Sequence, residues 1–245
     1  MPYFYLSPHL DDVSLSCGGL VWEQVQAGEQ VEIWTICAGD PPPGSLSHYA
    51  EELHWRWGYG RKAIAERRIE DKHSCKVLGA GFRHFEVPDA VYRSHPKTGE
   101  ILYDSEKAIF GGLKEDGEIL IRSLVLMMTE LIPPGSTLVA PLTLGNHVDH
   151  QLTRTVAERM KMPLAYYAEY PYVLDHAGAI SALVPSGYHP KLHTISIKGL
   201  EAWQDSVAAH TTQISTFWPD VETMREEITK YHSKVGGVRM WNKKN

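Results

Sequence analysis

The stretch YFYLSPHLDDVSLSCGGLVWEQVQAGEQVEIWTI, residues 3–36, decides the fold. It opens with an aromatic and apolar run, Tyr3 to Ser7, which predicts a strand that ends at the loop Pro-His-Leu-Asp-Asp. A helical pattern of apolar residues follows and stops at Gly28, and Val31 to Ile36 predicts a second strand. A helix that connects two strands in this way is typical of a parallel sheet.

The same alternation continues along the chain and predicts the fold class. Helices are expected over residues 61–78, 119–132, 151–160, 200–209 and 221–231, and strands over residues 84–87, 137–141, 164–168 and 193–197. Residues 38–60 are rich in Pro, Gly and aromatic side chains, so we expect a long irregular loop that serves as a lid or rim. Together these elements predict one α/β domain over residues 1–245, with a Rossmann-like, mostly parallel sheet and helices on both faces.

The composition excludes several classes of protein. The 24 basic and 30 acidic side chains give a formal net charge of −6, so no positive field would hold nucleic acid. No apolar run reaches the roughly 18 residues of a membrane span, and the first residues show no secretory pattern, so we expect a soluble, cytoplasmic protein. Cys17, Cys37 and Cys75 form no CxxC pair and are expected to be reduced thiols in the core.

Two clusters of His and Asp follow two of the predicted strands. PHLDD, residues 8–12, comes directly after the first strand, and NHVDH, residues 146–150, comes shortly after the strand TLVAP, residues 137–141. Loops at the carboxyl ends of parallel strands meet at one edge of a sheet. Imidazole nitrogen and carboxylate oxygen are suitable zinc ligands, and a catalytic zinc takes three protein ligands and keeps one position open. The sequence therefore predicts a metal-dependent active site at the carboxyl edge.

The spacing within the clusters indicates which side chains would face the ion. His9 and Asp12 are three residues apart across a tight turn, so both can point at one ion while Asp11 projects to the other side. Asp11 then faces the open position, and His150 completes three ligands from the second cluster. Adjacent carboxylates repel each other unless a cation lies between them, which also favours a divalent metal here.

The two clusters, in this order and after strands, resemble the signatures of the PIG-L, or LmbE-like, family of zinc-dependent N-acetylglucosaminide deacetylases. SPHLDDVSLSCGG, residues 7–19, is similar to the family's His-Pro-Asp-Asp-Glu motif, and HVDH, residues 147–150, is similar to its His-Pro-Asp-His motif. ERRIEDKHSCKVLGA, residues 66–80, and VPDAVYR, residues 87–93, add supporting similarity. By the order of its motifs, the resemblance is good through the strand expected over residues 164–168 and poor beyond it.

The resemblance implies a reaction and a metal. The reaction is hydrolysis of an N-acetyl, or other N-acyl, amide on a glucosamine-type sugar or glycoconjugate, with zinc as the cofactor. The implied zinc ligands are His9, Asp12 and His150.

The resemblance also implies catalytic and substrate-binding residues. Asp11 is the implied general base, and a protonated His147 is implied to stabilise the oxyanion and to help protonate the leaving amine. Asp149 is implied to fix an imidazole tautomer, as the histidines of metal sites usually require. Arg68 and Asp89 match family positions that contact the sugar.

Two residues depart from the family signature, and alternatives stay open. Leu10 stands where the family has Pro, and Val13 stands where it has Glu, which changes local hydrogen bonding. One alternative is a non-catalytic sugar- or metal-binding protein, although binding alone does not need the free carboxylate of Asp11. Others are a zinc amidase acting on a different acyl amide such as a glycopeptide, a different divalent metal, and a homo-oligomer. Glu169 is expected either at the pocket mouth or as a solvated surface carboxylate.

Overall fold

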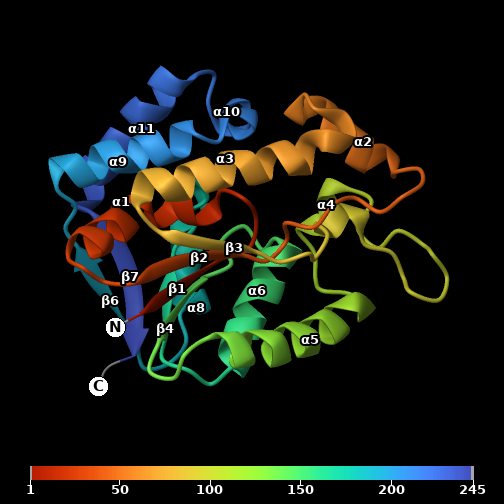
Figure 1. The fold of residues 1–245 in the computed structure, drawn as a ribbon, viewed down its shortest axis with the longest axis horizontal. Helices are drawn as coiled ribbons and strands as arrows, with labels where there is room; N and C mark the ends of the chain where they lie inside the picture. Colours follow the sequence, from red (N-terminus) through yellow and green to blue (C-terminus); the bar gives the residue numbers. More distant parts are fainter. Residues whose placement is uncertain (1, 244–245) are drawn as a thin grey trace.

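A seven-stranded sheet forms the centre of the computed structural model, which describes residues 2–243 (Figure 1). Its strands are β1 (Tyr3–Ser7), β2 (Val31–Thr35), β3 (Gly81–His84), β4 (Thr137–Pro141), β5 (Leu164–Tyr167), β6 (Tyr188–His193) and β7 (Val238–Lys243). They lie in the order β3-β2-β1-β4-β5-β7-β6; β7 pairs antiparallel with both β5 and β6, and the other pairs are parallel. The predicted mostly parallel α/β fold is confirmed. Residues 1, 244 and 245 of the predicted domain lie outside the described residues.

The strands that carry the two His-Asp clusters are neighbours at the centre of the sheet. Tyr5 of β1 pairs with Ile33 of β2 on one side and with Val139 of β4 on the other. The near-continuous apolar sequences of β1 and β4 suit strands that are covered on both faces. Because these two strands are parallel and adjacent, the segments after Ser7 and Pro141 emerge at the same edge.

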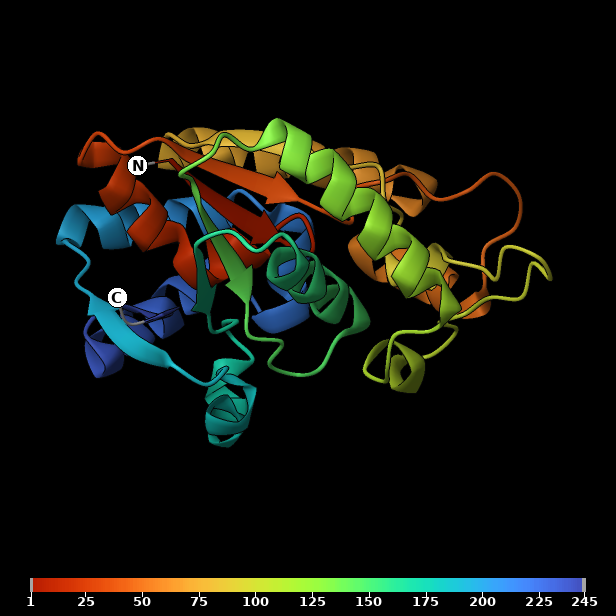
Figure 2. The same cartoon turned by 90° about the horizontal axis from the view of Figure 1, so that it is seen from below.

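Helices cover both faces of the sheet (Figures 1 and 2). One face carries α1 (Asp12–Gln26), α3 (Ala63–Leu78) and α9 (Ile197–Ala208), with α10 (Thr211–Phe217) and α11 (Val221–Val235) further out, and the other carries α5 (Glu115–Leu131) and α6 (Val148–Arg159). A Cβ atom on Gly18 would lie 2.8 Å from Trp203 Cδ1 of α9, so glycine permits the close packing of α1 against α9.

The prediction of an irregular loop over residues 38–60 is wrong in part, because this segment contains the helix α2 (His48–Trp57). The side chain of Ser47 caps this helix by accepting a hydrogen bond from the Ala50 N–H. Gly58, with a φ of 83°, ends it in the left-handed conformation that glycine adopts readily. The segment is therefore a capped helix where an irregular loop was expected.

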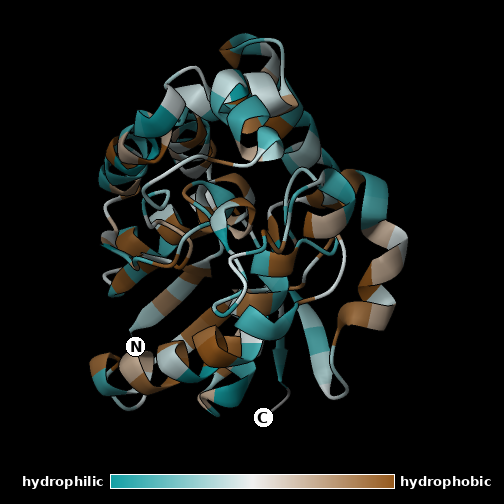
Figure 3. Ribbon diagram, turned by 90° about the vertical axis from the view of Figure 1, so that its right-hand side faces the viewer, coloured by the Kyte–Doolittle hydropathy of each residue, from teal (hydrophilic) through white to brown (hydrophobic). Residues whose placement is uncertain are grey.

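A second, smaller apolar cluster lies beyond the carboxyl edge, apart from the main core of the sheet. It joins α2 to the short helix α4 (Glu106–Ile109) and to the 3-10 turn η2 (Ala90–Tyr92), and Trp57, Tyr92, Tyr103 and Ile109 belong to it. Figure 3 views the molecule from this end, where hydrophobic and hydrophilic segments meet around the edge of the sheet. This cluster supports the wall above the His-Asp segments.

Two further predictions of strands are corrected, and one strand was missed. The strand expected over residues 193–197 is wrong, because β6 ends at His193 and α9 begins at Ile197. β7 was not predicted, yet it fills the gap between β5 and β6. The strand expected over residues 84–87 is also shifted: β3 ends at His84, and isolated bridges such as Cys37 to Glu86 follow it.

The cysteines and the helices also bear on two predictions from composition, reduced core thiols and the absence of a membrane span. Cys17, Cys37 and Cys75 are buried free thiols, and burial raises the pKa of each. Among residues 2–243, no helix combines the length and the apolar character that crossing a membrane requires.

Candidate metal centre and active site

Two helix N-termini converge at the carboxyl edge and bring the two clusters together. Helix α1 begins at Asp12, with Asp11 as its N-cap, and α6 begins at Val148, with His147 as its N-cap. Asp12, Asp149 and His150 therefore lie in first helical turns, where the sequence had suggested loops. The partial positive charge at a helix N-terminus favours the carboxylates of Asp12 and Asp149 at these positions.

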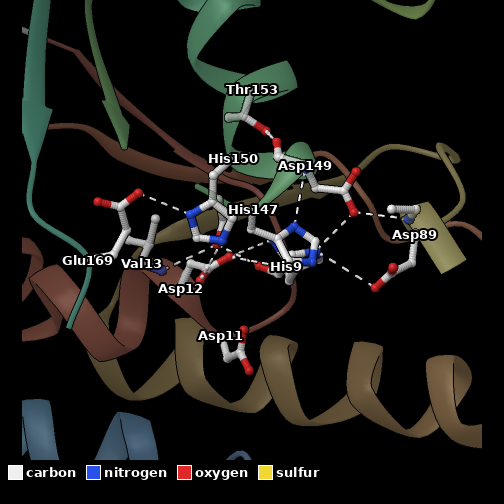
Figure 4. A network of polar contacts seen from close by, with 12 residues as sticks. His9, Asp11, Asp12, Val13, Asp89, His147, Asp149, His150, Thr153 and Glu169 are labelled. Carbon is white, nitrogen blue, oxygen red and sulfur yellow. Dashed lines mark hydrogen bonds and ion pairs between the residues drawn. The ribbon is translucent and has the colours of Figure 1, made fainter. Parts of the chain in front are cut away.

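Asp12 lies between two imidazole rings (Figure 4). Its Oδ2 is 3.3 Å from Nδ1 of His9 and also accepts the His9 backbone N–H at 2.7 Å, while its Oδ1 is 3.4 Å from Nε2 of His150. A tetrahedral zinc with bonds of about 2.0–2.2 Å separates its ligand atoms by roughly 3.3–3.6 Å. The spacing and the chemistry of this N,O donor set fit a zinc ion.

The same group of side chains offers two other overlapping donor sets. The nitrogen atoms of His9, His147 and His150 lie within 4.8 Å of one another, and so do donor atoms of His9, Asp89 and Asp149. His9 belongs to every set, so it is the centre of the cluster. The contacts of Asp12 with both His9 and His150 are the closest match to the spacing of ligands around one ion.

His9 and His150 each contact a buried carboxylate through the ring nitrogen that does not face Asp12. Glu169 Oε1 lies 3.0 Å from Nδ1 of His150 and accepts the Thr143 N–H at 2.7 Å. Asp149 Oδ2 lies 3.1 Å from Nε2 of His9. Such carboxylates fix the tautomer and the orientation of histidines in metal sites. Both imidazoles therefore present their remaining nitrogen to Asp12.

Glu169 is a residue of the candidate site that the sequence analysis placed wrongly. It is fully buried, where a pocket mouth or a solvated surface was expected, and its Oε2 has no hydrogen-bond partner among the described residues. Its position just after β5 was the available signal, because the carboxyl ends of parallel strands meet at this edge. The carboxylate beside His150 thus comes from Glu169, while Val13 packs in the main apolar core.

The charges of the cluster favour a cation at its centre. Burial would lower the pKa of His9, but contacts with Asp12 and Asp149 outweigh burial and hold that pKa well above its ordinary value. Burial would likewise lower the pKa of His150, but Asp12 and Glu169 outweigh burial and raise that pKa. Burial would raise the pKa of Asp12, but His150 and His9 lower it. The carboxylates therefore stabilise positive charge where a metal would sit.

Asp11 points away from the imidazoles and towards α3, as Figure 4 shows. Its Oδ2 lies 3.4 Å from Nη2 of Arg67, a buried residue of α3. Burial raises the pKa of Asp11, and the positive charge of Arg67 opposes part of that rise. Asp11 is therefore a carboxylate that takes no part in the contacts between His9 and Asp12, and its pKa is raised.

His147 corrects the expectation of a protonated imidazole. Its Nδ1 accepts the N–H of Asp149 at 3.2 Å, which caps α6 and leaves the ring proton on Nε2. Burial, and then the charge of His9, lower the pKa of His147 to about 3. The ring lies edge-on to His9, with centroids 4.8 Å apart. His147 is therefore a neutral hydrogen-bond donor through Nε2.

Of the two predicted sugar contacts, only Asp89 lies at the site. Asp89 Oδ2 is 3.7 Å from Nε2 of His9, and Asp89 lines the cavity over the cluster. Arg68 points elsewhere: it donates hydrogen bonds to the Ala38 carbonyl and to Asp40, each at 2.7 Å. The adjacent Arg67 lines the cavity instead, with its guanidinium 5.0 Å from the ring centroid of Trp57.

A cavity of ≈ 350 Å³ opens over the cluster. This volume lies in the range of roughly 300–1,000 Å³ found for small-molecule sites. Helices α2 and α10 both contribute to its lining, and its aromatic side chains are Tyr49, Trp57, Phe110, Tyr172 and Phe217. Asp11, Asp12, His9 and His147 form the polar floor. The cavity combines aromatic walls with a charged reacting centre, as expected for a site that binds a small polar ring.

Comparison with known proteins identifies the family. The sequence profile described as GlcNAc-PI de-N-acetylase, PIG-L, matches residues 4–161, so the chain belongs to the PIG-L family. This confirms the resemblance inferred from the two clusters.

The individual relatives share about a quarter of their residues with this chain. The 2'-N-acetylparomamine deacetylase of Niallia circulans is 28% identical over 191 residues, which are 71% of this chain and 68% of that protein. A zinc-inhibited form of teicoplanin deacetylase Orf2 superposes with a TM-score of 0.82 at 23% identity, over 99% of this chain and 97% of that one. The A40926 pseudoaglycone deacetylase Dbv21 gives a TM-score of 0.71 at 25% identity, over 98% and 96%.

Proposed function

We propose that this protein is a zinc-dependent hydrolase that removes an N-acetyl, or other N-acyl, group from a glucosamine-type sugar or glycoconjugate. One observation carries the proposal: Asp11 and His147 line the same cavity as His9 and Asp12, and Asp12 in turn contacts His150. A carboxylate and a neutral imidazole around one centre are the parts that amide hydrolysis requires. Membership of the PIG-L family supports the same reaction.

In this proposal His9, Asp12 and His150 hold the metal, and Asp149 and Glu169 orient the two imidazoles. Zinc, when bound, would polarise the acyl carbonyl and lower the pKa of water. The nitrogen and oxygen donor set also suits other divalent first-row metals, so zinc is the expected ion and another divalent metal is the alternative.

Asp11 and His147 have complementary tasks. Asp11, ionised beside Arg67, accepts a proton from the attacking water and later delivers it to the leaving amine nitrogen. His147 donates its Nε2 proton as a hydrogen bond to the carbonyl oxygen, where negative charge develops. The acyl carbon gains the hydroxyl group and loses the amine, so the products are a carboxylate and a free amino sugar.

The substrate assignment rests on the cavity and on the relatives. Aromatic rings such as Trp57 and Tyr172 can stack on a sugar face, while Asp89 and Arg67 can bind its hydroxyl groups. The relative from Niallia circulans is a 2'-N-acetylparomamine deacetylase. A small amino sugar glycoside is therefore the first substrate class to test. A protein that only binds sugar has less support, because binding alone does not need a carboxylate, Asp11, that lines the cavity beside the metal-ligand candidates.

The variant Asp11→Asn tests the proposed function. It is nearly isosteric and keeps the proposed metal ligands, so kcat for acetate release should fall by at least the roughly 10²-fold typical of lost acid–base catalysis. Acetate release from an N-acetylglucosaminide and from 2'-N-acetylparomamine is measured together with zinc content. Asp175→Asn, at an exposed carboxylate of the short helix α7 (Val173–His176), is the matched control and should behave as wild type. Near-wild-type turnover in metal-replete Asp11→Asn protein would contradict the role of Asp11.

A further inference from the structure

Arg93 is a buried guanidinium that lies behind the candidate metal centre. Its Nη2 donates a hydrogen bond of 2.6 Å to Oδ1 of Asp149, the carboxylate that contacts His9. Its Nε lies 3.0 Å from Oδ2 of Asp116, an ion pair without the alignment of a hydrogen bond. Arg93 does not line the cavity, so it acts on the site only through its neighbours.

The contacts of Asp149 leave it little freedom. Oδ1 accepts the hydrogen bond from Arg93, and Oδ2 accepts the Ala90 N–H at 3.0 Å and lies 3.1 Å from Nε2 of His9. Ala90 and Arg93 both belong to the segment VPDAVYR, which also brings Asp89 into the cavity. This one segment therefore fixes both oxygens of the carboxylate that orients His9.

The same guanidinium group also contacts helix α5, through its Nε. Asp116 lies in the first turn of that helix and accepts a hydrogen bond of 2.9 Å from the hydroxyl of Tyr103. The same hydroxyl accepts the Lys114 N–H at 2.8 Å, and the Arg93 guanidinium lies 5.0 Å from the Tyr103 ring centroid. The network is buried, so solvent screens it weakly.

We propose that Arg93 is a positioning residue: anchored by Asp116, it holds Asp149 and thereby fixes the orientation in which His9 binds the metal. The inference rests on the proposed function, because it assumes that His9 is a metal ligand. Removal of a partner that orients a metal ligand typically costs about 10–100-fold in metal affinity. Arg93 lies one contact further out, but it holds Asp149 by a charged hydrogen bond of 2.6 Å, so its loss should have an effect of this order.

The test is the zinc dissociation constant of folded apoprotein, measured by competition with a chromophoric chelator. Arg93→Met should raise this constant about 10–100-fold. Asp116→Asn, which keeps the contact of Arg93 with Asp149 but neutralises its anchor, should raise it by a smaller factor. At saturating zinc, Arg93→Met should lower kcat more than it changes KM, because Arg93 makes no contact in the cavity.

A matched control separates positioning from general destabilisation. Asp71→Asn removes a comparably buried carboxylate, whose Oδ2 lies 2.7 Å from His84 Nε2, away from the cavity. It should lower the melting temperature and leave the zinc dissociation constant unchanged. Equal loss of zinc affinity in Asp71→Asn and Arg93→Met would overturn the proposal, as would wild-type affinity in Arg93→Met.

Arg93→Met could also fail to fold, and the proposed function itself could fail; each case gives a distinct result. If Arg93→Met does not fold, Asp116→Asn decides, and an unchanged zinc dissociation constant in that variant contradicts the proposal. A failure of the proposed function would look different, because wild-type protein itself would then bind no zinc or release no acetate.

Discussion

At the scale of single residues, hydrogen bonds assign roles that residue type alone leaves open. His147 and His150 lie three positions apart in one motif, yet the first caps a helix and the second contacts Glu169. Sequence could predict that both lie at the site, because the motif follows a buried strand. It could not predict that His147 is neutral, because that depends on the Asp149 N–H that its Nδ1 accepts.

The neutral state of His147 makes a prediction about pH dependence. His147→Asn keeps an N-cap side chain but removes the Nε2 donor, so kcat should fall about 10²–10³-fold, as when one oxyanion donor is removed. With a pKa lowered to about 3, His147 stays uncharged above about pH 4, and its loss should remove no limb of the pH profile.

The profile of kcat/KM against pH, in wild type and variant, provides the measurement. Burial raises the pKa of Asp11, so the limb on which activity rises with pH should lie above the ordinary carboxyl value of about 4 in both proteins. Selective loss of a basic limb in His147→Asn would instead show that His147 acts as a protonated acid.

The predicted sugar contact, Arg68, is one position away from Arg67, the arginine that lines the cavity. Successive residues of a helix point about 100° apart, so Arg67 faces Asp11 while Arg68 reaches Asp40 at the rim. Alignment of a weak motif cannot resolve such a shift, whereas the position of α3 on the sheet does.

At the scale of elements, strands with both faces buried were predictable and the others were not. β1 and β4 are short apolar runs that end at turn-forming residues, a pattern typical of buried strands, and the segments that carry the site follow them. β6 is an edge strand with exposed Pro190 and Lys191, so it lacks such a run, and its partner β7 joins from the far end of the chain. Helix α2 escaped prediction because its stability comes from its caps and from the second apolar cluster.

The packing of α1 on α9 gives a prediction at this scale. Gly18→Ala would place a Cβ atom 2.8 Å from Trp203 Cδ1 and 2.9 Å from Ser206 Oγ, which should cost about 1–3 kcal/mol. Thermal unfolding should show a melting temperature lower by roughly 2–4 °C per kcal/mol for a chain of this size. Gly112→Ala is the control, because no heavy atom lies within 4 Å of its added Cβ. Equal melting temperatures for the two variants would refute the close contact.

At the scale of the whole molecule, the sheet sets the distances within the site. Because β1 and β4 are adjacent and parallel, the first turns of α1 and α6 face each other, and residues about 140 positions apart, such as His9 and Asp149, come into contact. Much of the remaining cavity wall comes from α2 and α10, the latter beyond the part of the chain that the family profile matches. We therefore expect the reacting centre to be shared with the family and the substrate range to be particular to this chain.

The most direct test of the central claim is a zinc titration of chelator-stripped protein, with acetate release from an N-acetylated amino sugar as the readout. The stripped protein should be inactive, and activity should rise in proportion to zinc until about one ion is bound per chain, since one set of three ligands holds one catalytic ion. Full turnover in the stripped protein, or no acetate release at any zinc concentration, would contradict the assignment of this PIG-L family member as a zinc-dependent N-deacetylase.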